Sequence, residues 1–206
     1  MSKTKAAAAV GGLSRTSKMP AKSYGLPAAE CATGSKLHKV AGSVCADCYA
    51  LKGNYRRYPA IVAAQYRRLA TISGSNWVAD MVTAIGSDAY FRWHDSGDIQ
   101  SREHLAKICA VAEATPDCQH WLPTREKRIV RDYARAGGSI PANLVIRISA
   151  AMVDGEPPRD FPHTSTVHKH AEPLGHRCPA PDQDGKCGDC RACWNSSVKN
   201  VSYCWH

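Results

Sequence analysis

The chain has 206 residues, enough to bury one sizeable core, and its 44% hydrophobic and 22% charged residues exclude fibrous and intrinsically disordered proteins. No apolar stretch approaches the roughly 20 residues that cross a bilayer, so we expect a cytoplasmic protein without a membrane partner. The net charge of +9 comes from residues 1–77, which contain twelve Lys or Arg and only two acidic residues, Glu30 and Asp47. This positive charge either attracts nucleic acid or offsets the negative charge of a thiolate-ligated metal centre.

Residues 1–16 lack the periodic apolar residues of a packed element, and we expect a flexible basic tail there. Residues 17–172 are predicted to form one α/β domain, entered through a loop that carries the sequence CADCYALKG. Apolar residues at helical spacing then predict two helices, one opened by Pro59 and one capped by Asn76 and ended by Gly86. Residues 173–206 are predicted to form a cysteine-rich, cluster-binding module that packs on this domain.

Strands and helices alternate from residue 89 onward. The predicted strands are AYFRWH, QHWLPT and NLVIRIS, separated by helices that begin near Ser101 and Thr124, and HTSTVHKH predicts a further strand. This order is typical of parallel βαβ units. Side-chain alternation places Arg92 and His94 on one face of the first strand, and a polar face is better suited to lining a cavity than to lying under helices. We therefore predict a partial or TIM-like barrel.

The carboxyl ends of the predicted strands carry polar residues. Ligands and chemistry gather at this edge of parallel α/β folds, so a small-molecule substrate is expected there. The candidate catalytic residues are His94, Asp95, Asp98 and Arg125, and the candidate substrate-binding residues are Arg92, Thr124, Arg147 and Ser149. Two alternatives stay open: the aspartates cap the turn and the following helix, and Thr124 and Arg125 form an ordinary exposed cap.

Ten cysteines in a reducing compartment indicate metal binding rather than disulfides. Within CPAPDQDGKCGDCRACW, three cysteines follow one another at two-residue spacings, which favours an iron-sulfur cluster over zinc; the four candidate ligands are Cys178, Cys187, Cys190 and Cys193. Three earlier cysteines, Cys31, Cys45 and Cys48, would leave one position of a second cluster open. Alternatively, Cys45 and Cys48 join two C-terminal cysteines around a single shared cluster. Cys109, Cys118 and Cys204 are predicted to be structural.

The four segments KMPAKSYGLPAAECATGSKLHKVAGSVCADCYALKG, YFRWHDSGDIQS, HWLPTRE and CPAPDQDGKCGDCRACW together resemble the gene-product-88-like family of phage proteins. The resemblance spans about residues 17–203 and implies a phage-encoded, cluster-binding protein. More distantly, the CxxCY pair followed by βα units resembles radical S-adenosylmethionine enzymes, whose partial barrel carries a three-cysteine 4Fe-4S cluster. The match departs from that pattern because Cys31 lies fourteen residues before Cys45.

The sequence therefore predicts a 4Fe-4S protein with one or two clusters, which acts as a cluster-dependent enzyme at the carboxyl edge of its strands. S-adenosylmethionine is a candidate cofactor for radical chemistry, and an open iron acting as a Lewis acid in a hydrolytic reaction is the other route. The alternative from another class is a zinc-stapled nucleic-acid-binding phage protein, in which the basic N-terminal third contacts phosphates and tyrosines of GNYRRY stack on bases.

Overall fold

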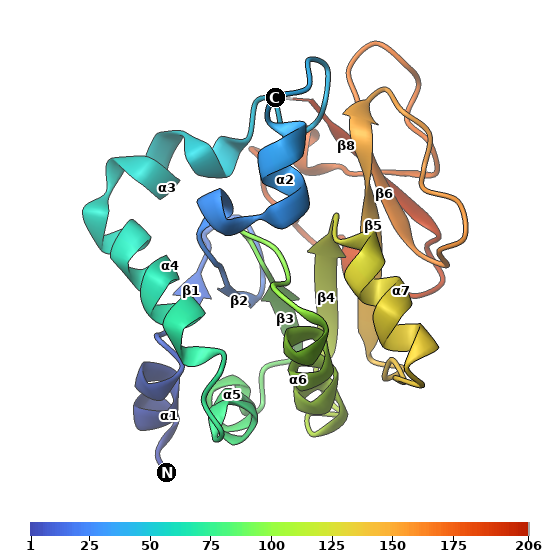
Figure 1. Ribbon diagram of the computed structural model, residues 1–206. Coiled ribbons are helices and arrows are strands. Elements are labelled where there is room, and N and C mark those ends of the chain that lie inside the picture. Colours follow the sequence, from blue (N-terminus) through green and yellow to red (C-terminus); the bar gives the residue numbers. More distant parts are fainter. Residues whose placement is uncertain (206) are drawn as a thin grey trace.

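The computed structural model describes residues 1–205, and position 206 of the predicted module lies outside the described residues. The described chain is an α/β protein with seven α-helices and one eight-stranded sheet (Figure 1). The helices are α1 (Lys3–Ala9), α2 (Ala32–Leu37), α3 (Gly53–Arg57), α4 (Pro59–Thr71), α5 (Trp77–Ile85), α6 (Arg102–Glu113) and α7 (Lys127–Arg135). Short 3-10 turns lie at Ala28–Glu30, Tyr49–Leu51, Ala180–Asp182 and Ala192–Trp194.

The strands are β1 (Ser14–Arg15), β2 (Lys22–Tyr24), β3 (Tyr90–Trp93), β4 (Gln119–Thr124), β5 (Leu144–Val153), β6 (Thr164–His168), β7 (His176–Arg177) and β8 (Asn200–Cys204). Their order in the sheet is β1-β2-β3-β4-β5-β6-β8-β7, and every pair except β1 with β2 is parallel. The predicted α/β class is confirmed. The predicted partial or TIM-like barrel is not confirmed: the sheet is not closed, β1 and β7 are its two edges, and the strands after β5 are joined without α-helices.

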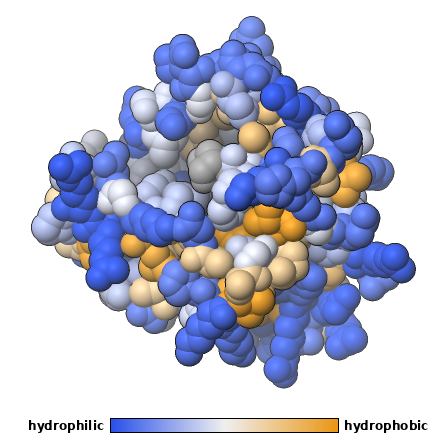
Figure 2. All heavy atoms as spheres, turned by 90° about the horizontal axis from the view of Figure 1, so that it is seen from above, coloured by the Kyte–Doolittle hydropathy of each residue, from blue (hydrophilic) through white to orange (hydrophobic). Residues whose placement is uncertain are grey.

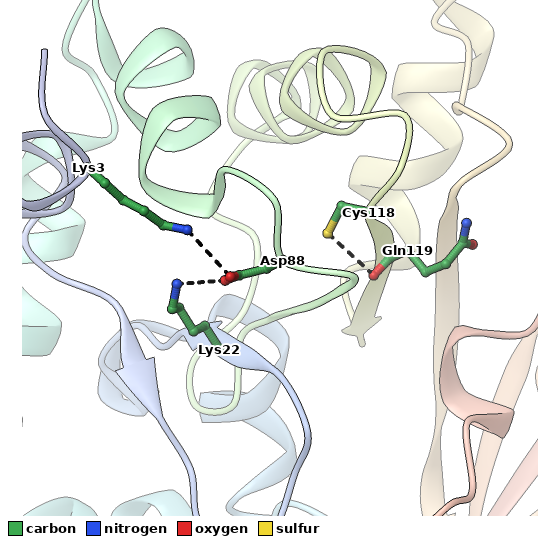
Figure 3. Close-up of polar contacts among 5 residues, drawn as sticks. All are labelled: Lys3, Lys22, Asp88, Cys118 and Gln119. Atoms are coloured by element: carbon green, nitrogen blue, oxygen red, sulfur yellow. Dashed lines mark hydrogen bonds and ion pairs between the residues drawn. The ribbon is translucent and has the colours of Figure 1, made fainter.

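The expected flexible tail is instead a packed helix. Ser2 caps α1 by accepting a hydrogen bond from the Lys5 amide, and the side chains of Ala6 and Val10 are fully buried. A run of alanines has high helix propensity and little side-chain entropy to lose, so a short helix forms once one face is covered. Figure 3 shows how the same region is fixed to the sheet: Lys3 and Lys22 both point to Asp88, at 3.5 and 2.7 Å.

The two faces of the sheet are covered differently. On one face, the aromatic and aliphatic side chains of the strands pack against α5 and α6 in the main core, which includes Phe91, Trp93, Leu122, Met81 and Leu105. Cys109 and Cys118 belong to this core, as their predicted structural role requires. The opposite face carries a smaller core that joins strand residue Trp121 to Trp194 of the cysteine-rich module, with Tyr90, Cys193 and Tyr203 around them.

A buried arginine fastens the cysteine-rich module to the sheet. Arg147 on β5 is fully buried, and all three of its guanidinium nitrogens donate to backbone carbonyls. These carbonyls belong to the module or the segments beside it: Thr164, Ala192, Cys193, Asn195, Val198 and Lys199, at 2.7 to 3.4 Å. The structure therefore uses the donors of Arg147, predicted from sequence to bind substrate, to join β5 to the module and to β6.

Candidate functional site

Three thiols from two separate stretches of the chain gather above the sheet. Cys31 immediately precedes α2, whereas Cys45 and Cys48 lie in the turn that follows it. A Cβ atom built on Gly34 would lie 3.7 Å from the Cys31 sulfur and 3.8 Å from the Cys45 sulfur, so the two sulfurs flank the same point of the helix. The loop is held by β5, through backbone bonds from Val44 to Ala151 and from Val153 to Gly42. We call Cys31, Cys45 and Cys48 the N-terminal thiol group.

The surroundings of this group disfavour free thiolates. Burial raises the pKa of the Cys31 thiol above its ordinary value, and the nearby charges of Asp98, Cys48 and Cys45 raise it further. Burial also raises the pKa of Cys45, opposed by the positive charge of Arg125. Thiolates held this close together need a cation between them to offset their desolvation and mutual repulsion.

Asp98 lies beside the thiols at the carboxyl edge of β3 and β4. Its carboxylate accepts hydrogen bonds from the Thr124 hydroxyl at 2.5 Å, the Arg125 amide at 2.9 Å and its own neighbour's amide, Ile99, at 2.8 Å. Burial nevertheless raises its pKa to about 6, because these bonds only partly offset the loss of water. The hydroxyl of Thr124 therefore positions the Asp98 carboxylate.

Asp95 is the second buried carboxylate at this edge. Two tyrosines from the cysteine loop reach it: Tyr49 donates to its carbonyl at 2.5 Å and Tyr55 donates to its carboxylate at 2.9 Å. The other carboxylate oxygen, Oδ1, has no hydrogen-bond partner within the described residues. Burial and the charge of Asp95 both raise the pKa of Tyr55, so this tyrosine acts as a hydrogen-bond donor.

Arg92 lies on the face of the sheet opposite the helices. Its guanidinium lies over the Trp121 ring at 4.5 Å, and its Nε atom is buried without a hydrogen-bond partner in the described chain. Burial raises the pKa of Tyr49 and of Cys187, and the charge of Arg92 opposes both shifts. The charge of Arg92 thus acts both on Tyr49, which follows Cys48, and on the cysteine-rich module.

His94 does not share a face with Arg92, so that prediction is wrong. Its backbone has a φ of 55°, in the left-handed region, which breaks the alternation of β3 and turns the ring toward α6. The ring lies 5.4 Å from that of His104, is almost fully buried, and has no hydrogen-bond partner on either nitrogen among residues 1–205. Burial, with a contribution from His104, holds the pKa of His94 well below its usual range. His94 is a neutral ring on the helix side of the sheet.

A second set of four thiols lies in the cysteine-rich module. Burial is the main cause of the raised pKa of Cys178, and the charge of Cys190 raises it further. Burial likewise raises the pKa of Cys187, and the charge of Cys178 adds to this shift. Burial raises the pKa of Cys193 to about 12. We call Cys178, Cys187, Cys190 and Cys193 the C-terminal thiol group.

Two side chains of the neighbouring strands contact this second group. The Cys190 sulfur lies 3.4 Å from Nε2 of His176 on β7, and the Cys193 sulfur lies 3.2 Å from the hydroxyl of Tyr203 on β8. Within residues 1–205, no three His, Cys, Asp or Glu side chains are drawn close enough to chelate a single metal ion.

The other predicted substrate-binding residue, Ser149, lies on β5. Its hydroxyl accepts a hydrogen bond from Ser165 at 3.1 Å, and it lines a groove beside α7. The structure thus brings Asp98 and Arg125 to the N-terminal thiol group and Asp95 to two tyrosines of the cysteine loop, whereas His94 and Arg147 face elsewhere.

Several site residues were missed by sequence reasoning. Glu126 accepts hydrogen bonds from the amide and hydroxyl of Thr33, both at 2.7 Å, and so ties α2 to the start of α7. Tyr49 follows Cys48 directly and Tyr55 lies in GNYRRY, so their position beside a cysteine loop was an available signal. His176 lies two residues before Cys178, which was also an available signal. Tyr203 carries no such signal, because only the fold brings its hydroxyl to the Cys193 sulfur.

Comparison with known proteins gives one result. A family model described as gene product 88 matches residues 1–196. The chain belongs to the gene product 88 family of phage proteins. A search of curated proteins and a search of solved structures found no match. The resemblance drawn from the four sequence segments is confirmed by this family match, which also covers α1.

In the part of the chain that the structure describes, no helix combines the length and the apolar character that crossing a membrane requires.

Proposed function

We propose that this member of the gene product 88 family binds 4Fe-4S clusters and is a cluster-dependent enzyme. The observation that carries the proposal is the gathering of Cys31, Cys45 and Cys48 at the carboxyl edge of β3 and β4, beside Asp98 and Arg125. Three thiolates would leave one iron without a protein ligand, at the edge where parallel α/β proteins bind their substrates.

The donor sets fit this cofactor. Both groups consist of soft sulfur ligands, which suit iron-sulfur clusters, and both are partly buried among groups that raise the pKa of the free thiols. The C-terminal thiol group supplies four candidate ligands for a second cluster, and its contact with Tyr203 is the kind of hydrogen bond that tunes cluster potential. Bound at the N-terminal group, a cluster would supply either a Lewis-acidic iron or an electron for cleavage of S-adenosylmethionine.

The residues of the chain would hold and orient the substrate. The guanidinium of Arg125 has a buried Nε without a partner in residues 1–205 and suits a carboxylate or phosphate of the substrate. Asp98, fixed by Thr124, would move a proton, and the unpartnered oxygen of Asp95 would accept a hydrogen bond. His94 is not part of this proposal, because its ring faces α6.

Anaerobic reconstitution with iron and sulfide tests the cluster. Alanine variants of Cys31, Cys45 and Cys48 are each expected to lose about four iron atoms per chain, since all three would hold one cluster. The matched control is Cys109→Ala, whose sulfur lies in the helix-side core, and it should retain the full iron content. Equal iron and acid-labile sulfide in all four variants would remove the N-terminal cluster from the proposal.

A zinc-bound, nucleic-acid-binding protein is the second candidate. The contact between Cys190 and His176 favours it, because zinc accepts mixed thiolate and imidazole ligands. Metal analysis of the anaerobically purified protein separates the two: a colourless protein with stoichiometric zinc and no sulfide supports zinc. For the radical route, release of 5′-deoxyadenosine from S-adenosylmethionine under reducing conditions is the assay. An intact cluster without release would leave the Lewis-acid route.

A further inference from the structure

A basic groove runs along α7, next to the N-terminal thiol group. Its volume is about 550 Å³, and Thr33 and Arg125 at one end belong also to the surroundings of the thiols. Five cationic side chains line the groove against one carboxylate, that of Asp132; they are Arg125, Lys127, Arg128, Arg131 and Arg135. Figure 2, which looks down on the side where α2 lies in Figure 1, shows that hydrophilic side chains cover most of this face.

The acids of this region neutralise only part of the charge. Asp132 lies 3.4 Å from Arg128 and 3.7 Å from Arg135, and Asp160 lies 3.5 Å from Arg131. All of these pairs are largely exposed and therefore weak. Arg125 and Lys127 form no ion pair among the described residues. The groove thus keeps a clear positive excess that an anion can occupy.

We infer that this groove binds the phosphate backbone of a nucleic-acid strand. The cations are spread along α7 instead of converging on a point: from Lys127 to Arg135 the helix rises about 12 Å, the length of roughly three to four phosphates at 3.4 Å each. A single small phosphate would contact only part of such a row. Arginine, which makes up four of the five cations, pairs with phosphate oxygens in a bidentate manner.

The lining also indicates the mode of recognition. Among the described residues, no aromatic side chain lines the groove, so it offers no surface on which bases would stack. Binding should therefore depend on phosphates and not on base sequence. The cations of this groove lie outside the basic N-terminal third that the sequence suggested for nucleic acid. The inference goes beyond the proposed cluster chemistry and does not depend on it.

Titration of a fluorescent twenty-nucleotide oligo(dT) with the full-length protein tests the inference. For wild type, the logarithm of the binding constant should fall with the logarithm of salt concentration with a slope of about −2.5, as three to four phosphate contacts on a single strand require. The test variant is Arg128→Gln/Arg135→Gln, whose side chains are 93% and 78% exposed, so that the fold is undisturbed. It should weaken binding about tenfold or more at 0.1 M salt and reduce the slope by about 1.4.

The matched control removes the same charge elsewhere. Arg56→Gln/Arg57→Gln changes two exposed arginines of α3 and should leave the dissociation constant within about twofold of wild type. Unchanged binding by the α7 variant overturns the inference, and so does a larger loss in the α3 variant, which would move the contact to the N-terminal surface. Full competition by thymidine monophosphate at the same phosphate concentration would also overturn it, because it would identify a site for one small anion.

Discussion

At the scale of single residues, Gly34 shows how closely the N-terminal thiol group is built. A methyl group at this position would lie 2.9 Å from the Cys31 Cβ, closer than ordinary packing allows. Replacing glycine inside a helix with alanine normally stabilises the helix by about 1 kcal/mol. The requirement for glycine here comes from the neighbouring cysteines and not from the helix itself.

We therefore expect Gly34→Ala to lower the iron bound at the N-terminal group without raising the melting temperature, because the methyl group displaces Cys31. Iron and sulfide analysis after reconstitution, together with thermal unfolding, measures both effects. Ser35→Ala on the same exposed helix is the matched control and should keep the wild-type iron content. A Gly34→Ala protein with full iron and higher stability would show that the cysteines tolerate the extra methyl group.

A second residue-scale prediction concerns Arg147. Lysine at this position carries three donors, so several of the buried carbonyls that Arg147 now satisfies would lose their hydrogen bonds. Each unsatisfied carbonyl costs about 1–3 kcal/mol. Arg147→Lys should lower the free energy of unfolding by about 3 kcal/mol or more, as measured by urea titration. The exposed Arg135→Lys should change it by no more than about 0.5 kcal/mol; equal effects would contradict the anchoring role.

At the scale of elements, the packing of α6 on β3 and β4 makes the core sensitive to acid. His104 on α6 and His120 on β4 are buried, and burial lowers their pKa values to about 3 and about 4. Both rings are neutral in the folded protein at neutral pH. The unfolded chain takes up protons near pH 6.5, whereas the folded chain does so only well below that, so acid favours unfolding.

The contribution of His104 can be isolated. The stability that neutral His104 contributes is fully present above pH 6.5 and is lost progressively as the pH falls toward 3. At pH 5 the loss is about 2 kcal/mol. His104→Gln should therefore show a smaller decrease in unfolding free energy between pH 7 and pH 5 than wild type, by about that amount. Exposed His170→Gln is the control and should keep the wild-type pH dependence. Identical pH profiles for all three proteins would contradict the burial argument.

At the scale of the whole molecule, α1 is part of the core. It packs on α5, and the Tyr24 hydroxyl donates to the carbonyl of Val10 at 2.9 Å, joining the helix end to β2. Deleting residues 2–10 should lower the free energy of unfolding by about 3 kcal/mol or more, because it removes a buried valine and exposes its neighbours. Urea unfolding measures the effect. Lys3→Ala/Lys5→Ala, which removes two exposed lysines and the weak Lys3–Asp88 ion pair but no buried side chain, should cost less than about 1 kcal/mol.

The sequence predicted the elements whose pattern is local. The strands β3, β4 and β5 and the helices α4 to α7 were expected within a few residues, because apolar residues recur at their period and Pro59 and Ser101 mark helix starts. The helix α1 was missed, since alanines carry little hydrophobic pattern and its burial depends on α5. The left-handed backbone of His94 and the anchoring role of Arg147 also escaped, because both are set by tertiary contacts.

The candidate site was predictable in its residue types and less so in its geometry. The cysteines and the carboxylates of HDSGD were identified from sequence, yet only the structure brings Cys31 to Cys45 across fourteen residues. No spacing rule predicts that Glu126 would bind α2 or that the charge of Arg92 would act on both Tyr49 and Cys187. These relations depend on which strands are neighbours.

The position of β8 has a consequence for how the protein is made. It lies between β6 and β7 and pairs with both, although it follows them in the chain, and β7 has no other neighbour in the described sheet. During translation, Cys178, Cys187, Cys190 and Cys193 leave the ribosome before the strand that fixes their module. These sulfurs are therefore open to oxidation or to a metal donor for the time that β8 takes to emerge and insert.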